Sequence, residues 1–178
     1  MGFCSAMVLP GDGIIQGRGS LMLLAEQPMA QRTPGGARPL AITTRSSGGW
    51  GSYPGSSMGV HALTRQALLD GHWQARSRDI FEENPDGNEP PYEGRSLDSM
   101  RDVLEGREPV IIDASTEIRA LRGAKLADEF ELDAIILGGG TEFRRVDEIA
   151  ATNRPLIVPL LFPDKPKVEG LRSTEDIT

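Results

Sequence analysis

Cysteine and histidine are scarce in this chain of 178 residues. Its one cysteine, Cys4, excludes a disulfide within the chain and any CxxC metal site. The two histidines, His61 and His72, are eleven positions apart, which excludes the i, i+4 spacing of helical metal sites. A zinc site within this chain would therefore depend on carboxylates. We expect each histidine to be a structural residue with its hydrogen bonds satisfied.

Aromatic residues, long apolar runs and clusters of positive charge are also lacking. Aromatic residues make up 5% of the chain, so its core must be mainly aliphatic. No run of about 18 apolar residues predicts a membrane span, and the first residues lack the regions of a signal peptide. The net charge of −7 and the scattered basic residues argue against a nucleic-acid or anionic-membrane surface. The cellular compartment stays open.

The most regular stretch, residues 109–161, alternates short apolar runs with amphipathic segments. It predicts strands at 110–112, 134–137 and 156–158, buried on both faces because they lack an alternating pattern. Two helices are expected between them, with apolar stripes of Ile118, Leu121, Ala124, Ala127 and Phe130 and of Phe143, Val146, Ile149 and Ala150. Such alternation implies parallel strands joined by right-handed crossovers. The stretch therefore predicts an α/β fold of parallel βαβαβ units.

The chain divides by composition at residue 56. Residues 1–56 are rich in Gly, Ser and Pro, and we expect an irregular, extended segment with short strands. This segment needs a partner surface, because it has too little apolar area for a core of its own. Residues 57–178 hold the βαβαβ units, whose three strands leave at least one open sheet edge. An open edge indicates part of a larger α/β body and allows self-association.

Two helices are predicted ahead of the βαβαβ units. The first covers 57–76, with Ser56 or Ser57 as its N-terminal cap. Gly71 is expected to loosen its last turn, at a cost of about 1 kcal/mol relative to Ala. The second is a short helix over 97–105, whose apolar residues are spaced as one face.

A glycine-rich turn, Gly138 to Glu142, follows the strand at 134–137. Its amides can hold an anion, and it lies at the carboxyl end of a parallel strand, where α/β proteins bind ligands. Gly138, Gly139, Gly140 and Thr141 are candidate substrate-binding residues, and Glu142 is a candidate catalytic residue. The competing interpretation is a plain strand-to-helix turn capped by Thr141. The absence of GxGxxG and GxxxxGK[ST] fingerprints favours that interpretation.

Asp113 follows the strand at 110–112 and lies at the same predicted end of the sheet. A carboxylate there can act as a metal ligand, a general base or a substrate contact. We therefore name Asp113 as a candidate catalytic residue. The alternative is a helix cap or turn residue before Glu117, and the spacing does not decide between the two.

Several motifs follow one another in order over about residues 10–172. They are YPGSSMGVHALTRQALLD at 53–70, EGREPVIIDA at 105–114, a helix ending in ADEF at 127–130, GGGTEFRRVDEIAA at 138–151 and FPDKPKVE at 162–169. Together they resemble the metal-dependent amidohydrolases, in the imidazolonepropionase-like branch. The resemblance implies a TIM-type (β/α)8 barrel that hydrolyses a non-peptide C–N bond of a linear or cyclic amide with a metal-activated water. It also implies a small-molecule substrate and a divalent metal, with zinc as the first candidate.

The chain departs from this family in its metal ligands. The family usually holds its metals with a His-x-His after an early strand, histidines at middle strands and a late Asp. Here no His-x-His is present, Asp113 stands where a metal-binding histidine is expected, and the strand at 134–137 ends in glycines. No metal ligand is therefore assigned, and we expect this chain alone to bind no metal.

A (β/α)8 barrel takes about 250 residues. The resemblance thus implies that residues 57–178 form an incomplete barrel that is inactive alone. The alternative is a non-catalytic α/β module that binds a small anion or serves as a scaffold.

Overall fold

A five-stranded sheet forms the centre of the molecule, in the order β2-β4-β5-β6-β7. The computed structural model describes residues 3–24, 38–46, 53–87, 89–91 and 94–160, with 26, 28, 33 and 36 as single positions. The strands are β2 (Ile15–Arg18), β4 (Leu40–Thr43), β5 (Val110–Asp113), β6 (Ala134–Leu137) and β7 (Leu156–Ile157). β4 to β7 run parallel, and β2 lies antiparallel to β4. The predicted α/β fold with parallel strands is confirmed.

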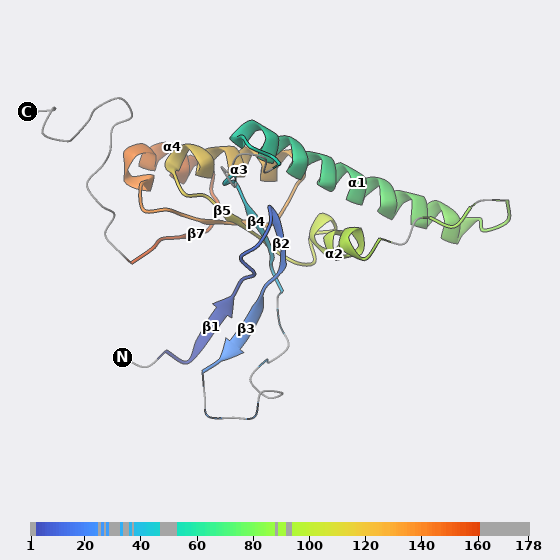
Figure 1. The fold of residues 1–178 in the computed structure, drawn as a ribbon, viewed down its shortest axis with the longest axis horizontal. Helices are drawn as coiled ribbons and strands as arrows, with labels where there is room; N and C mark the ends of the chain where they lie inside the picture. The colour runs from blue at the N-terminus through green and yellow to red at the C-terminus, as the bar shows by residue number, and fades with distance from the viewer. Residues whose placement is uncertain are drawn as a thin grey trace, which may run out of the picture.

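The predicted order of elements in the C-terminal half is also confirmed. α3 (Glu117–Glu129) connects β5 to β6, and the 3-10 turn η2 (Glu142–Arg145) and α4 (Val146–Ala151) connect β6 to β7. Figure 1 shows α3 and α4 on the same side of these strands. β5 lies in the middle of the sheet, and its residues Val110, Ile111 and Ile112 are at most 3% exposed. This strand is therefore buried on both faces, as its continuous apolar run predicts.

The buried face of α3 matches the predicted stripe in part, since Ala124, Ala127 and Phe130 are buried as expected. Ile118 is 46% exposed, whereas Ala120, Gly123 and Ala127 are buried. A repeat of three residues drifts around a helix with 3.6 residues per turn, so Ile118 and Ala127 point to opposite sides. The inward face consists of small residues, and a Cβ on Gly123 would lie 2.9 Å from Cγ2 of Ile112. α3 therefore packs closely against β5.

Most of the second predicted stripe lies on the surface, while Ile149 is partly buried and packs against the core. Phe143 and Val146 are each 59% exposed, and α4 has no buried residue. The neighbouring Ile157 and Val158 are 43% and 54% exposed, so β7 is not buried on both faces as expected. The physical reason is that β7 pairs with β6 alone, and nothing in the described part of the chain covers its outer edge.

α1 (Ser57–Glu83) is longer than predicted and packs against α2 (Arg95–Leu104). Ser56 caps it as expected, since its hydroxyl accepts a hydrogen bond of 3.1 Å from the amide of Gly59. Gly71 does not loosen the last turn. It is buried mid-helix, where an added Cβ would lie 2.9 Å from Cδ1 of Leu104, so it allows α2 to approach. No helix in the described ranges is long and apolar enough to cross a bilayer.

The N-terminal segment contributes to the main sheet. Within residues 1–56, β4 lies between β2 and β5, and its Leu40 and Ile42 are at most 1% exposed. The sheet therefore extends across the compositional division at residue 56, and β4 finds its partner surface there.

The strand β3 (Ser20–Leu23) follows β2 after the single residue Gly19 and pairs antiparallel with β1 (Ser5–Val8). Figure 1 shows this two-stranded ribbon projecting away from the sheet and helices.

Candidate functional site

The parallel strands bring the predicted site residues to one edge of the sheet. Thr43 at the end of β4 pairs in register with Asp113 at the end of β5, and Asp113 pairs with Leu137 of β6. The turn from Gly138 to Glu142 follows directly. Asp113 and the glycine-rich turn therefore lie at neighbouring strand ends, in the position where α/β proteins bind ligands.

Asp113 is bonded to two residues that follow or end β4. Its Oδ2 accepts hydrogen bonds from Nη2 of Arg45 at 2.6 Å and from Oγ1 of Thr43 at 3.2 Å. The cap of α3 is Thr116, whose Oγ1 accepts from the amide of Arg119 at 3.3 Å. The interpretation of Asp113 as a helix cap is therefore wrong. Its carboxylate fixes the chain after β4 and neutralises an arginine there.

The glycine-rich turn holds an anion that belongs to the chain itself. The carboxylate of Glu142 accepts hydrogen bonds from the amides of Gly139 at 2.6 Å and Gly140 at 2.9 Å. Glycine is needed here, because a Cβ on Gly138 would lie 2.5 Å from Oε1 of Glu142, and one on Gly139 would collide with the carbonyl of Ser115. The amides proposed for a substrate are thus engaged by the buried Glu142.

The Thr141 side chain is hydrogen-bonded to the neighbouring helix and not to the helical turn that it precedes. Its hydroxyl donates to Oε2 of Glu117 at 2.7 Å and accepts from the amide of Glu117 at 3.1 Å. Thr141 occupies the N-cap position of η2 as predicted, but its side chain makes no capping hydrogen bond there. Sequence reasoning missed Glu117 as a member of this edge, because an acid in the first turn of a helix is an ordinary feature.

Glu117 is buried yet stays acidic. Burial acts to raise its pKa, but the Thr141 hydroxyl, the backbone amide of Glu117 and the positive charges of Arg144 and Arg145 outweigh burial. The pKa of Glu117 is therefore below its usual value. The contacts at this edge of the sheet therefore favour the ionised form of Glu117.

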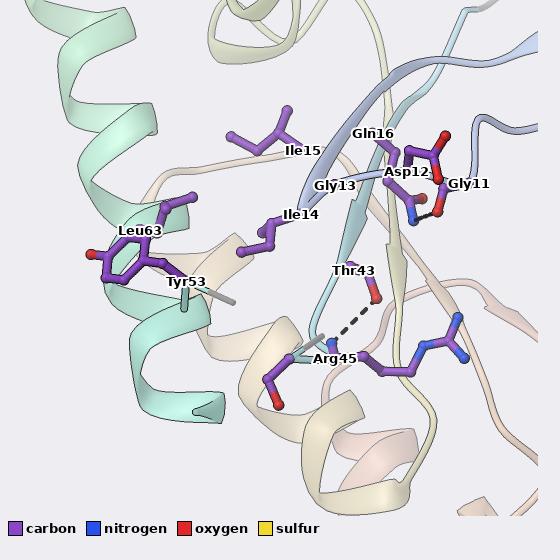
Figure 2. Close-up of a pocket in the computed structure, with 11 residues that line it drawn as sticks. Gly11, Asp12, Gly13, Ile14, Ile15, Gln16, Thr43, Arg45, Tyr53 and Leu63 are labelled. Atoms are coloured by element: carbon purple, nitrogen blue, oxygen red, sulfur yellow. Dashed lines mark hydrogen bonds between the residues drawn. The ribbon is translucent and has the colours of Figure 1, made fainter. Parts of the chain in front are cut away.

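A cavity of about 750 Å³ lies beside this edge (Figure 2). It is lined by the loop 11–16 and by Thr43, Arg45, Ser46, Tyr53 and Leu63. Arg45 and Thr43 connect the cavity to Asp113, because both donate hydrogen bonds to its carboxylate. The sequence carried no chemical signal for this cavity, since the glycines of residues 11–17 mark turns and nothing more.

The described residues do not fit the metal that the family resemblance implies. Nowhere in the described ranges do three His, Cys, Asp or Glu side chains come together. Asp113 is paired with Arg45, Glu142 with backbone amides, and His72 stacks on Phe130 with ring centroids 6.1 Å apart. No hydrolytic step can therefore be drawn through a metal held by these residues.

His61 does not match the expectation of a histidine with satisfied hydrogen bonds. Its Nε2 is buried and has no hydrogen-bond partner in the part of the chain that the structure describes. Burial first, and then the positive charges of Arg122, Arg65 and Arg119, lower its pKa below 6.5. The neutral form is therefore favoured in the folded chain.

The fold is similar to that of an amidohydrolase. The crystal structure of the amidohydrolase from Thermotoga maritima MSB8 matches with a TM-score of 0.80 at 18% sequence identity. The match covers 93% of this chain and 44% of that chain, so this chain spans less than half the length of that amidohydrolase. No protein-family model matches the sequence, and no curated protein matches it.

This similarity concerns the fold. It confirms the expected likeness to the amidohydrolases at that level, with parallel strands and helices in the same arrangement as in the Thermotoga amidohydrolase. The imidazolonepropionase-like branch and the closed barrel remain predictions.

Proposed function

We propose that this chain is part of an amidohydrolase-like hydrolase that cleaves a non-peptide C–N bond of a small linear or cyclic amide. The observation that carries the proposal is the fold similarity to the Thermotoga amidohydrolase over 93% of the chain. In this proposal the protein is of the imidazolonepropionase-like branch, and the complete enzyme is a TIM-type barrel that uses a divalent metal, zinc before others. Its metal ligands lie outside the described residues.

The described part supplies one portion of the active face in this proposal. Asp113 is the candidate catalytic carboxylate that stands next to the cavity, because its partners Thr43 and Arg45 line the wall. Glu142 and the turn 138–141 lie one strand further. The hydrogen bonds of this turn are internal, so we propose that it forms a fixed boundary beside the substrate-binding space and does not bind the substrate.

The open edge beyond β7 supports an incomplete barrel. An apolar surface of Phe143, Val146, Ile157, Val158 and Leu160 is 43–93% exposed around this edge. Exposed apolar residues beside unpaired strand groups favour a further strand–helix unit of the same barrel as their cover. Without that cover, we expect copies of this chain to associate through this edge.

The alternative is a non-catalytic module that binds a small anion or acts as a scaffold. It is favoured by the lack of a metal-binding group among the residues with described positions. It is also favoured by the internal contacts of the carboxylates at both strand ends, which are the ion pair of Asp113 with Arg45 and the hydrogen bonds of Glu142 to its own turn.

The deciding experiment compares this chain with the full product of its reading frame. Zinc content is measured by mass spectrometry after incubation with zinc and dialysis, and hydrolysis is measured on a panel of small linear and cyclic amides. We expect neither bound zinc nor hydrolysis for this chain, and both for the full product. A full product without either activity supports the module. Stoichiometric zinc on this chain alone overturns the proposal that its ligands lie elsewhere.

A further inference from the structure

The cavity beside Arg45 has two chemically different ends. Figure 2 shows Ile14, Leu63 and Tyr53 gathered toward one end, while Arg45 and Asp12 lie toward the other. Its volume of about 750 Å³ is in the range of small-molecule sites, roughly 300–1,000 Å³. Small-molecule sites combine apolar surface with placed polar groups, and this cavity is lined by both kinds of residue. The cavity therefore suits a ligand with an apolar body and a polar head.

Arg45 is held in place before any ligand arrives. Its Nη2 donates to Oδ2 of Asp113 at 2.6 Å, and its backbone amide donates to Oγ1 of Thr43 at 3.2 Å. The Thr43 hydroxyl in turn donates to the same Asp113 oxygen. A side chain that is already ordered loses less conformational freedom on binding.

The guanidinium of Arg45 also keeps unused donors. Its side chain is 58% exposed, and its Nε and Nη1 make no hydrogen bond to other residues in the described ranges. A guanidinium has five N–H donors in a planar fork that matches the two oxygens of a carboxylate. Arg45 can therefore bond Asp113 and a ligand carboxylate together.

The charged residues that line the cavity favour a carboxylate over a phosphate. Among the described residues that line the cavity, Arg45 is the one cation and Asp12 the one acid. A phosphate near neutral pH carries up to two charges and would meet a single arginine already shared with Asp113. A carboxylate carries one charge and has the planar shape that an arginine fork fits.

We propose that this cavity is a binding site for a small organic monocarboxylate. The carboxylate pairs with Arg45, and the apolar body lies against Ile14, Leu63 and Tyr53. Asp113 and Thr43 act on this ligand as positioning residues, since they hold the arginine. This proposal does not depend on hydrolysis, because Arg45 can bind a carboxylate whether the protein is an enzyme or a non-catalytic module.

The test uses isothermal titration calorimetry of the whole chain with 4-methylpentanoate as the probe. We expect 4-methylpentanoate to bind, its uncharged amide to bind about tenfold more weakly, and acetate, which lacks the apolar body, to bind more weakly still. Arg45→Gln should reduce the affinity for 4-methylpentanoate about tenfold or more. Arg45→Lys keeps the positive charge but lacks the planar guanidinium, so its affinity should lie between those of the wild-type chain and Arg45→Gln.

Arg107→Gln is the matched control. Arg107 is 54% exposed and donates to Asp102 at 2.6 Å, so it has similar exposure and a similar partner away from the cavity. Circular dichroism establishes that each variant is folded, and Leu63→Ala should weaken 4-methylpentanoate more than acetate. Equal affinity of the Arg45→Gln and Arg107→Gln variants would overturn the proposal. So would equal affinity for acid and amide, or tighter binding of inorganic phosphate.

Discussion

Thr141 and Glu117 exchange two hydrogen bonds across neighbouring strand ends. The Thr141 hydroxyl donates to the Glu117 carboxylate and accepts from the Glu117 amide, at 2.7 Å and 3.1 Å. Glu117 is 8% exposed, and Nη1 of Arg144 lies 3.8 Å from its other carboxylate oxygen. One threonine thus joins the turn after β6 to the first residue of α3.

Replacing Thr141 with Val should lower the free energy of unfolding by about 1–3 kcal/mol. The change removes the hydroxyl and leaves a buried carboxylate oxygen and a buried amide without that partner. Urea unfolding at neutral pH measures the loss. Thr152→Val is the matched control, since Thr152 donates a single bond of 2.7 Å to Ile149 within its own turn. A loss for Thr141→Val no larger than that of the control would contradict a role in joining the two elements.

Removing the Glu142 side chain should open the glycine-rich turn. Glu142→Ala leaves the amides of Gly139 and Gly140 without their acceptor, at a cost of about 1–3 kcal/mol. Thermal unfolding measures this loss, and added acetate should restore part of it by taking the place of the missing carboxylate. Glu148→Ala is the control, because Glu148 is 55% exposed and pairs only with Arg145 near the surface. If acetate stabilises both variants equally, the turn does not act as an anion site.

The stability of the chain should depend on pH through His61. The pKa of His61 is below 6.5 in the folded chain. Below pH 6.5, His61 therefore binds a proton more readily in the unfolded chain than in the folded chain, which lowers the free energy of unfolding. The His61 contribution is fully present above pH 6.5 and is lost as the pH falls toward the lowered folded pKa. Urea unfolding from about pH 8 to about pH 5 follows this loss. His61→Asn should flatten the slope in this window, whereas His72→Asn on the same helix should retain it.

The isolated chain should self-associate through the β7 edge. Sedimentation velocity is expected to show dimers or larger species, because an unpaired edge with exposed apolar residues favours strand pairing between copies. Val158→Lys should shift the chain toward monomer, since charge on an edge opposes pairing. Met58→Lys is the control, because Met58 is 75% exposed on α1, away from that edge. A wild-type monomer that melts cooperatively would count against an open edge.

The sequence was informative where one physical rule dominates. The apolar runs at 110–112 and 134–137 predict buried parallel strands. β5 is buried over these residues, whereas β6 alternates buried and partly exposed positions. Parallel pairing then required Asp113 and the turn 138–142 to meet at one edge, and the register shows that they do. Element type and strand direction follow from patterns within a few residues of each other.

The errors arose where contacts between distant residues decide. Thr116 and Asp113 are both ordinary capping residues by type, but Thr116 caps α3 whereas Asp113 is bonded to Arg45, 68 positions away. The inward face of α3 includes Gly123, which packs closely on Ile112, while Ile118 lies on the exposed side. The cavity joins residues 11–16 to Thr43, Arg45, Ser46, Tyr53 and Leu63, and no local sequence pattern predicts that these residues come together.

The extended segment from Ile15 to Leu23, which comprises β2 and β3, has a consequence for the order of folding. Its first half, β2, pairs with β4 in the main sheet, and its second half, β3, pairs with β1 in the projecting ribbon, with only Gly19 between them. A two-stranded ribbon has little stability alone. Once β2 docks, however, β3 leaves the sheet already extended and serves as a template for β1. The ribbon should therefore form after the sheet and open before it, and a truncation that removes β1 should leave the kinetics of the sheet unchanged.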